Sequence, residues 1–97
     1  MRVTIPHSLT RVEARKRIKA GTSELAGFIP GASGLRQEWQ GEDHLALDIA
    51  IMGAKIGAGV DIEDHQIVID VDLPVSLALL SGPIKNAIRD KSTKLLT

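Results

Sequence analysis

Four polar residues near one expected hairpin end are the first candidates for chemistry, because their side chains could bind a metal ion. His44 is expected to face Glu63 across two strands, with Asp64 and His65 in the adjoining turn. Imidazole and carboxylate groups are ligands of zinc and other transition metals. The chain has no close spacing such as His-x-x-x-His, and polar residues at a hairpin end are typical of solvent exposure. We therefore interpret His44, Glu63 and His65 as part of a solvated turn, and we expect no metal and no other cofactor.

Two aspartates could form an acid and base pair. Asp48 and Asp70 are expected on one face of a sheet, on either side of Gly59. Such a pair works in acid–base catalysis when burial separates the two pKa values. Both residues belong to the polar face, so ordinary charge repulsion in water is the simpler interpretation.

His7 is the remaining candidate for catalysis. It follows Pro6 at the end of the first expected strand, where its ring could hydrogen bond to local backbone and orient the turn. A catalytic histidine needs a nucleophile or a carboxylate within reach, and the sequence does not place Ser8, Ser76 or Ser81 beside it. We assign His7 a structural role and name no catalytic residue.

Length and composition limit the function classes. The 97 residues make one domain over 1–97, and the 12 basic and 12 acidic side chains give no net charge, 12 − 12 = 0. Nucleic acid is not an expected partner, because there is no overall field to attract it and Phe28 and Trp39 do not make a stacking surface. The absence of cysteine excludes disulfides and thiol catalysis. The sequence shows no secretory signal and no apolar run that could span a membrane, so we expect a cytoplasmic protein.

Alternating apolar residues predict that most of the chain after residue 34 forms β-strands with one buried face. The inward positions are Leu45, Leu47, Ile49, Ile51, Ile56, Val60, Ile62, Ile67, Ile69, Val71 and Leu73. Strands over 2–5 and 35–39 complete the expected sheet. A slip of one residue would turn a strand's apolar side outward, so the pattern predicts a three-residue loop at 41–43 and two-residue turns at 53–54 and 64–65.

This register places Ile49 opposite Ala58, and Ala58 opposite Val71. On the outer face it forms two rows, one of Asp48, Gly59 and Asp70 and the other of Ala50, Gly57 and Asp72. The small residues there would let a second copy approach closely, so Ala46, Ala50, Gly57, Gly59 and Val68 form a candidate homodimer patch. Strand twist and bending is the alternative reason for the glycines.

Helical spacing predicts two helices. Thr10 and Glu13 form a capping box, and apolar positions continue to Ile29, before a loop over 30–34. After the last strand and Pro74, a second helix is interrupted at Gly82-Pro83, where Ser81 could be the cap. The segment before it is apolar on more than one side, so some of its residues should remain exposed as a contact surface: Val75, Leu77, Leu79 and Leu80.

These elements predict an α+β fold of order β-α-β-β-β-β-α, with a four-to-five-stranded antiparallel sheet and two helices on one face. A curved sheet around a long terminal helix is a helix-grip-like arrangement. Larger proteins of that shape enclose apolar ligands, whereas the large inward residues of this chain could fill the space completely.

The chain resembles the small polyhydroxyalkanoic acid system family over essentially its whole length. The resemblance rests on Ile5-Pro-His-x-Leu9, Glu13-Ala-Arg15, Trp39-x-Gly41, Gly53, Ile56-Gly57, Asp61, Leu73, Leu79-Leu80, Ile84, Ile88 and Leu95-Leu96. The loop from Pro30 to Gly34 and Pro74 depart from the family pattern. The resemblance implies a bacterial protein encoded with the genes for polyhydroxyalkanoate storage granules, and it brings no catalytic residues to carry over.

Two functions remain open. The first is a non-catalytic accessory protein, cytoplasmic or granule-associated, that docks on the polymer surface or on granule proteins through Val75, Leu79 and Leu80. The second is a small carrier or enzyme that holds an acyl or other hydrophobic ligand between the sheet and the C-terminal helix. A cavity open to solvent would favour the second function.

Overall fold

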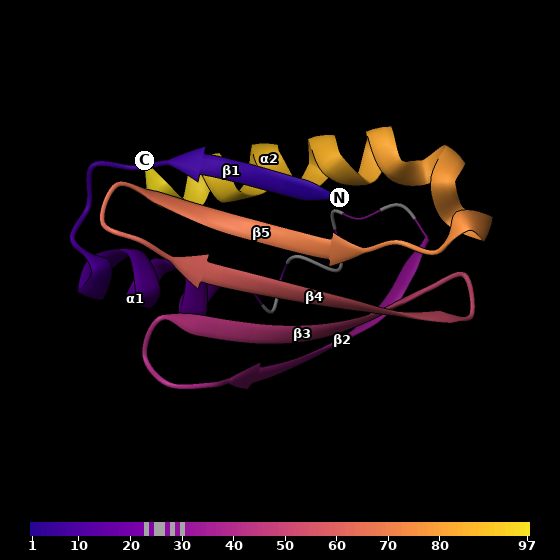
Figure 1. Cartoon of the computed structure of the whole chain (residues 1–97), viewed down its shortest axis with the longest axis horizontal. Helices are drawn as coiled ribbons and strands as arrows, with labels where there is room; N and C mark the ends of the chain where they lie inside the picture. Colours follow the sequence, from indigo (N-terminus) through magenta and orange to yellow (C-terminus); the bar gives the residue numbers. More distant parts are fainter. Residues whose placement is uncertain (23, 25–26, 28, 30) are drawn as a thin grey trace.

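The computed structural model describes residues 1–22, 24, 27, 29 and 31–97 of the chain. Five strands form one antiparallel sheet in the order β1-β5-β4-β3-β2 (Figure 1). Along the sequence the elements are β1 (Arg2–Pro6), α1 (Arg11–Gly21), β2 (Ala32–Trp39), β3 (His44–Ile51), β4 (Ala54–Ile62), β5 (Gln66–Asp72), the 3-10 helix η2 (Val75–Leu80) and α2 (Ser81–Leu96).

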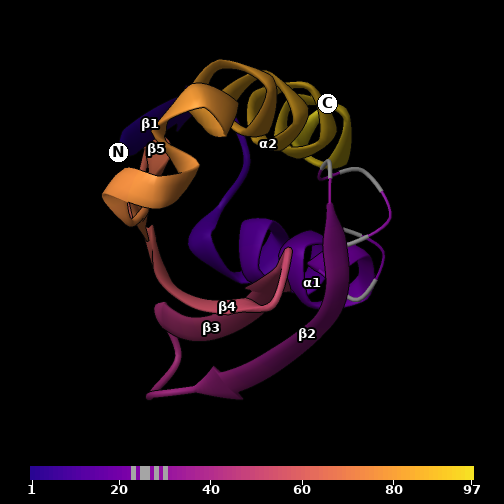
Figure 2. The same ribbon diagram turned by 90° about the vertical axis from the view of Figure 1, so that its right-hand side faces the viewer.

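The sheet is curved, and α1 and α2 lie on its concave face (Figure 2). α2 packs against β1 and against α1, and α1 also contacts β4. The predicted α+β class is therefore confirmed, with five strands and with the helix-grip-like order of elements. β1 is an edge strand, as expected from Pro6, which cannot donate a ladder hydrogen bond.

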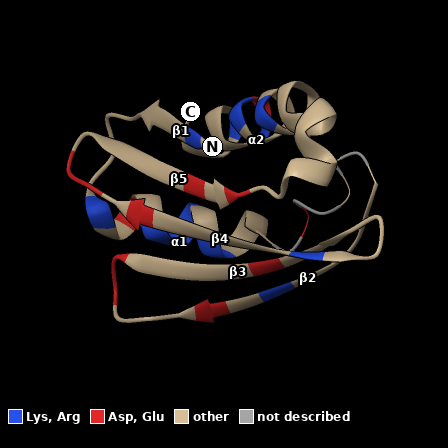
Figure 3. Ribbon diagram, turned by 45° about the vertical axis from the view of Figure 1, so that its right-hand side comes forward, with Lys and Arg blue, Asp and Glu red and all other residues tan. Residues whose placement is uncertain are grey.

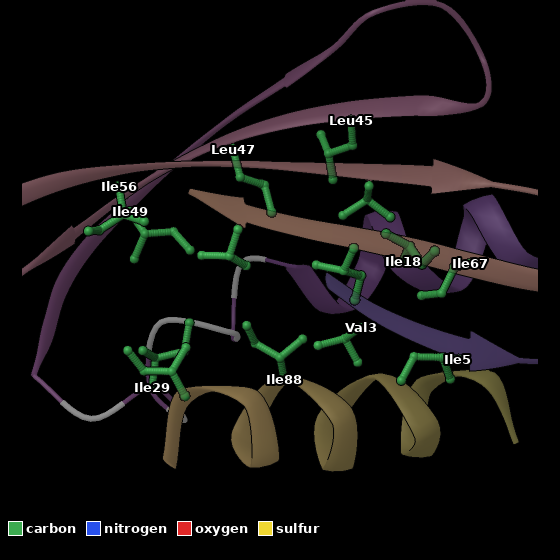
Figure 4. Packing of buried hydrophobic residues seen from close by; sticks show 14 of the residues in the cluster. Val3, Ile5, Ile18, Ile29, Leu45, Leu47, Ile49, Ile56, Ile67 and Ile88 are labelled. Atoms are coloured by element: carbon green, nitrogen blue, oxygen red, sulfur yellow. The ribbon is translucent and has the colours of Figure 1, made fainter. Parts of the chain in front are cut away.

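The core lies between the concave face and the helices, as the alternation predicted. Leu45, Ile51 and Ile56 have no exposed surface, and Ile84 and Ile88 of α2 are almost completely buried. Figure 4 shows Ile88 extending from α2 towards Val3, with the inward residues of the sheet beyond. Among the described residues, every buried side-chain nitrogen or oxygen has a hydrogen-bond partner.

α1 begins as predicted but ends earlier. The Oγ1 of Thr10 accepts a hydrogen bond from the Glu13 N–H at 3.2 Å, which caps the helix. α1 ends at Gly21 rather than continuing to Ile29, and the Thr22 hydroxyl donates to the Ile18 carbonyl at this end. Gly21 lies where α1 meets α2, and a Cβ there would require the Leu95 side chain to move. Ile29 is buried outside the helix, and Leu25 lies outside the described residues.

Two of the three predicted connections are confirmed. The Gln40 N–H donates to the His44 carbonyl at 2.9 Å across the 41–43 loop, and the Glu63 N–H donates to the Gln66 carbonyl at 2.9 Å across the 64–65 turn. The third is wrong, because Ile51 pairs with Ala54 and the β3–β4 turn consists of residues 52–53.

The β3–β4 register consequently differs by two residues from the prediction. Ile49 faces Ile56 instead of Ala58, whereas Ala58 faces Val71 as predicted. On the outer face, Asp48, Gly57 and Asp72 form one row, and Ala46, Gly59 and Asp70 form the next. A shift of two residues keeps every side chain on its own face, so the alternation could not detect it.

The remaining differences concern element ends. β2 begins at Ala32, inside the expected 30–34 loop, and a bulge lies between Ala32 and Gly34; Pro30 is outside the described residues. The predicted interruption near Pro83 is present as the change from η2 to α2. Ser81 is not its cap, because Leu80 occupies the N-cap position and no side chain caps α2.

Candidate functional site

Two of the four predicted contact residues are almost completely exposed. Val75 and Leu79 of η2 are 93% and 97% exposed. Leu77 is 8% exposed and belongs to the core, so the expectation that it contacts a ligand or granule is wrong. Leu80 is partly buried and packs against the core. A 3-10 helix brings residues three apart onto nearly one side, so Leu77 and Leu80 turn inward while Val75 and Leu79 face solvent.

Met52, in the β3–β4 turn, is a third exposed apolar residue at the same end of the molecule. Its side chain is 68% exposed, and Figure 1 shows its turn and η2 at one end of the long axis. We call Met52, Val75 and Leu79 the apolar end. Met52 was not among the predicted contact residues, because the turn was expected one residue later. The Met-Gly pair was the available signal, because a glycine as the second residue of a two-residue hairpin turn is favoured.

The opposite end carries a cluster of ion pairs. Arg11, at the start of α1, donates from Nε to Asp64 Oδ1 at 2.6 Å and from Nη1 to Asp43 Oδ2 at 2.9 Å. Arg15 lies 3.5 Å from Glu42 in the same loop as Asp43. Figure 3 shows these hairpin ends, coloured red for acidic residues, beside the part of the α1 ribbon that is coloured blue for basic residues. Two basic side chains of α1, Arg11 and Arg15, therefore contact the protein's own loops.

This arrangement shifts two ionisation equilibria. The hydrogen bond and the positive charge of Arg11 lower the pKa of the Asp64 carboxyl below its ordinary value of 3.8. The same contacts with Asp64 and Asp43 raise the pKa of the Arg11 guanidinium. Both groups are exposed, so the pair connects α1 to the β4–β5 turn without forming a buried charged site.

The interior leaves little space for a ligand. The pocket between α1, α2 and the sheet has a volume of about 30 Å³ and is lined by residues including Ile18, Leu47, Val60, Ile69 and Leu95. That is room for about one or two water molecules. Around this pocket, side chains therefore fill almost all of the space between the sheet and the two helices.

The candidate metal ligands do not converge. His44 lies opposite Asp61 and not opposite Glu63, and its Nδ1 is 2.6 Å from Asp61 Oδ1. Within the part of the chain that the structure describes, no three histidine or acidic side chains are placed to hold a metal ion. The proposed pair of Asp48 and Asp70 is also separated, because Asp48 lies in the row of Gly57 and Asp72.

His7 has the structural role that the sequence analysis assigned to it. Its Nδ1 accepts a hydrogen bond from the Leu9 N–H at 3.1 Å, so the Nε2, 2.9 Å from the Glu63 carbonyl, is the donor in the second bond. Both ring nitrogens are used, and they join the β1–α1 connection to the end of β4.

The predicted dimer patch lies among acidic and basic residues. Ala46 lies beside Gly59, where the His44 ring partly covers the backbone, whereas Ala50 and Val68 belong to other rows. Asp48, Asp70 and Asp72 lie in the two central rows. Basic residues share this face, because Arg2 forms a salt bridge with Asp70 at 2.8 Å and Arg36 lies opposite Asp48.

Comparison with known proteins identifies the family. A family model described as "Putative polyhydroxyalkanoic acid system protein (PHA_gran_rgn)" matches residues 1–96. The chain belongs to this family. Membership of the polyhydroxyalkanoic acid system family confirms the resemblance seen in the sequence. No helix among the described residues of this family member is long and apolar enough to cross a membrane.

No curated protein matches this family member. Among solved structures, the Zhui aromatase/cyclase from Streptomyces sp. R1128 is similar with a TM-score of 0.43 and 8% identity, covering 100% of this chain and 94% of that chain. The protein TTHA0849 from Thermus thermophilus is similar with a TM-score of 0.37 and 10% identity, covering 99% of this chain and 90% of that chain. Similarity this weak says nothing about function.

Proposed function

We propose that this protein is a non-catalytic accessory protein that binds the surface of polyhydroxyalkanoate storage granules through its apolar end. The near-complete exposure of Val75 and Leu79 is the observation that carries the proposal. Single exposed apolar residues are common, but these two lie on one short helix and Met52 lies at the same end of the molecule. Family membership supports the polymer as the partner.

The energy available is suited to reversible binding. Burying an exposed valine or leucine side chain contributes about 1.5–3 kcal/mol, so Val75 and Leu79 together contribute several kcal/mol before the costs of association. We therefore expect a cytoplasmic protein that exchanges between solution and the granule surface.

Co-sedimentation with granules tests the proposal. The double variant Val75→Asp/Leu79→Asp should lose at least about tenfold in affinity, because each substitution replaces buried apolar area with a charge. Val12→Asp is the matched control, because Val12 is 63% exposed and lies in α1 rather than in the apolar end. The control variant should bind as the wild type does, and circular dichroism should show both variants folded. Unchanged sedimentation of the double variant would contradict the proposal.

Protein-free polymer particles identify the surface that is bound. Binding to these particles with the same loss in the double variant would show that the polymer itself is the partner. Binding only to native granules would show that a granule protein is the partner.

The carrier function has less support. An acyl ligand needs a cavity of several hundred Å³, and the pocket between the sheet and the helices has about 30 Å³. The outward position of Val75 and Leu79 also leaves them unable to line that interior.

A further inference from the structure

The two edges of the sheet differ in how well they are protected. β1 is five residues long, contains Pro6 and has α2 packed against it. β2 is eight residues long, contains neither proline nor lysine, and ends at Trp39 beyond both helices (Figure 2). An unprotected edge strand offers its backbone N–H and C=O groups to another strand.

The hydrogen bonds to β3 show which groups of β2 are free. The Gln40 N–H donates to the His44 carbonyl, and bonded pairs alternate along an antiparallel ladder. The even-numbered residues of β2 therefore bond to β3. Leu35, Gln37 and Trp39 direct their N–H and C=O groups away from β3, to the edge where no further strand lies among the described residues.

The side chains of even-numbered and odd-numbered residues of β2 lie on opposite faces of the sheet. Arg36 and Glu38 lie on the convex face, opposite Asp48 and Ala46 of β3. Leu35 and Trp39 lie on the concave face and are only partly buried against the core. In the described part of the chain, neither Arg36 nor Glu38 takes part in a salt bridge.

We propose that two copies of this chain form a homodimer by antiparallel pairing of their β2 strands, centred on Gln37. Gln37 then faces Gln37 of the second copy, and Arg36 faces Glu38. On the concave side Leu35 faces Trp39. The free N–H and C=O groups of residues 35, 37 and 39 meet one another, and the two sheets become continuous.

Charge selects this register among those that the hydrogen bonds allow. Moving the centre to Arg36 would place Arg36 against Arg36, and moving it to Glu38 would place Glu38 against Glu38. Like charges directly opposite each other destabilise a strand pair, and opposite charges stabilise it. Unlike the predicted patch around Gly57 and Gly59, this edge also offers backbone N–H and C=O groups to a second copy.

Exchanging the charges of Arg36 and Glu38 tests the β2–β2 pairing. Sedimentation equilibrium measures the mass of each variant in solution. The wild type should be dimeric with a dissociation constant below about 100 μM. Arg36→Glu and Glu38→Arg should each weaken the dimer about tenfold or more, because each places like charges opposite each other twice. The double variant Arg36→Glu/Glu38→Arg should restore it. A monomeric wild type, or a dimer that the single variants leave intact, would overturn the proposal, as would failure of the double variant to restore it.

Cysteine cross-linking tests the register, since the chain has no cysteine of its own. The Cα atoms of a hydrogen-bonded antiparallel pair are about 5.5 Å apart, within the range of a disulfide. Gln37→Cys should therefore form a covalent dimer under mild oxidation. Gln40→Cys is the matched control, because Gln40 faces Gly34 in this register and lies far from Gln40 of the other copy. Equal cross-linking of both variants, or none in Gln37→Cys, would contradict the register. These variants leave Val75 and Leu79 unchanged, so the test of the dimer is independent of the test of granule binding.

Discussion

Arg11 joins three separate elements at the charged end of the molecule. It begins α1 and binds Asp43 of the β2–β3 loop and Asp64 of the β4–β5 turn. Exposed ion pairs contribute little individually. Here one guanidinium fixes two hairpin ends relative to a helix, so its contribution depends on the ionisation of both carboxylates.

The free energy of unfolding should depend on pH through the contact between Arg11 and Asp64. The folded pKa of Asp64 is lowered, so the stabilisation is fully present above its ordinary value of 3.8 and is lost as the pH falls through the lower folded value. Asp64→Asn should therefore show a smaller loss of unfolding free energy than the wild type between about pH 4 and pH 2, measured by urea denaturation. Asp90→Asn is the control, because Asp90 has no salt bridge in the described structure. An unchanged pH profile in Asp64→Asn would show that the Arg11 contact is absent in solution.

At the scale of elements, the sequence predicted what local patterns determine. Alternation identified the strands and their buried faces, and Thr10 with Glu13 identified the start of α1. The end of α1 was not predictable from spacing, because Ile29 is buried in the same core without belonging to the helix. Leu77 faces the core because η2 is a 3-10 helix. The spacing of apolar residues in the sequence did not reveal this geometry.

The β3–β4 turn shows the same limit. A turn at residues 53–54 and a turn at residues 52–53 leave the same side chains buried. Only the backbone conformation distinguishes the two turn positions. Met52 and Gly53 have φ values of 50° and 82°, and glycine adopts such values without steric cost.

Gly53→Ala should consequently destabilise the protein by about 1–2 kcal/mol, because an L-residue is strained in the left-handed conformation. Gly57→Ala is the matched control in the same hairpin, because a Cβ at Gly57 meets nothing within 4 Å. Urea denaturation should show little change for the control. Equal stability of Gly53→Ala and the wild type would place the turn elsewhere.

At the scale of the whole molecule, charged and apolar surfaces lie at opposite ends of an axis 37 Å long. Ion pairs of α1 close one end, and Met52, Val75 and Leu79 are exposed at the other. The sequence predicted Val75 and Leu79 as contacts but could not place Met52 with them, because their proximity depends on the assembled sheet. The register of the free β2 edge likewise required the hydrogen bonds to β3.

The closed interior leads to a prediction about ligands. Decanoic acid should not raise the melting temperature, because a pocket of about 30 Å³ cannot hold its chain. Differential scanning fluorimetry at increasing ligand concentration checks this, with the Val75→Asp/Leu79→Asp variant included to detect surface binding. A concentration-dependent rise in the melting temperature of both proteins would favour the carrier function.

Localisation in polymer-accumulating cells tests whether the protein docks on granules through its apolar end. Fluorescently tagged wild-type protein and the Val12→Asp variant should be concentrated on granules, whereas Val75→Asp/Leu79→Asp should be spread through the cytosol at equal expression. A cytosolic wild type, or a double variant that remains on the granules, would contradict the account.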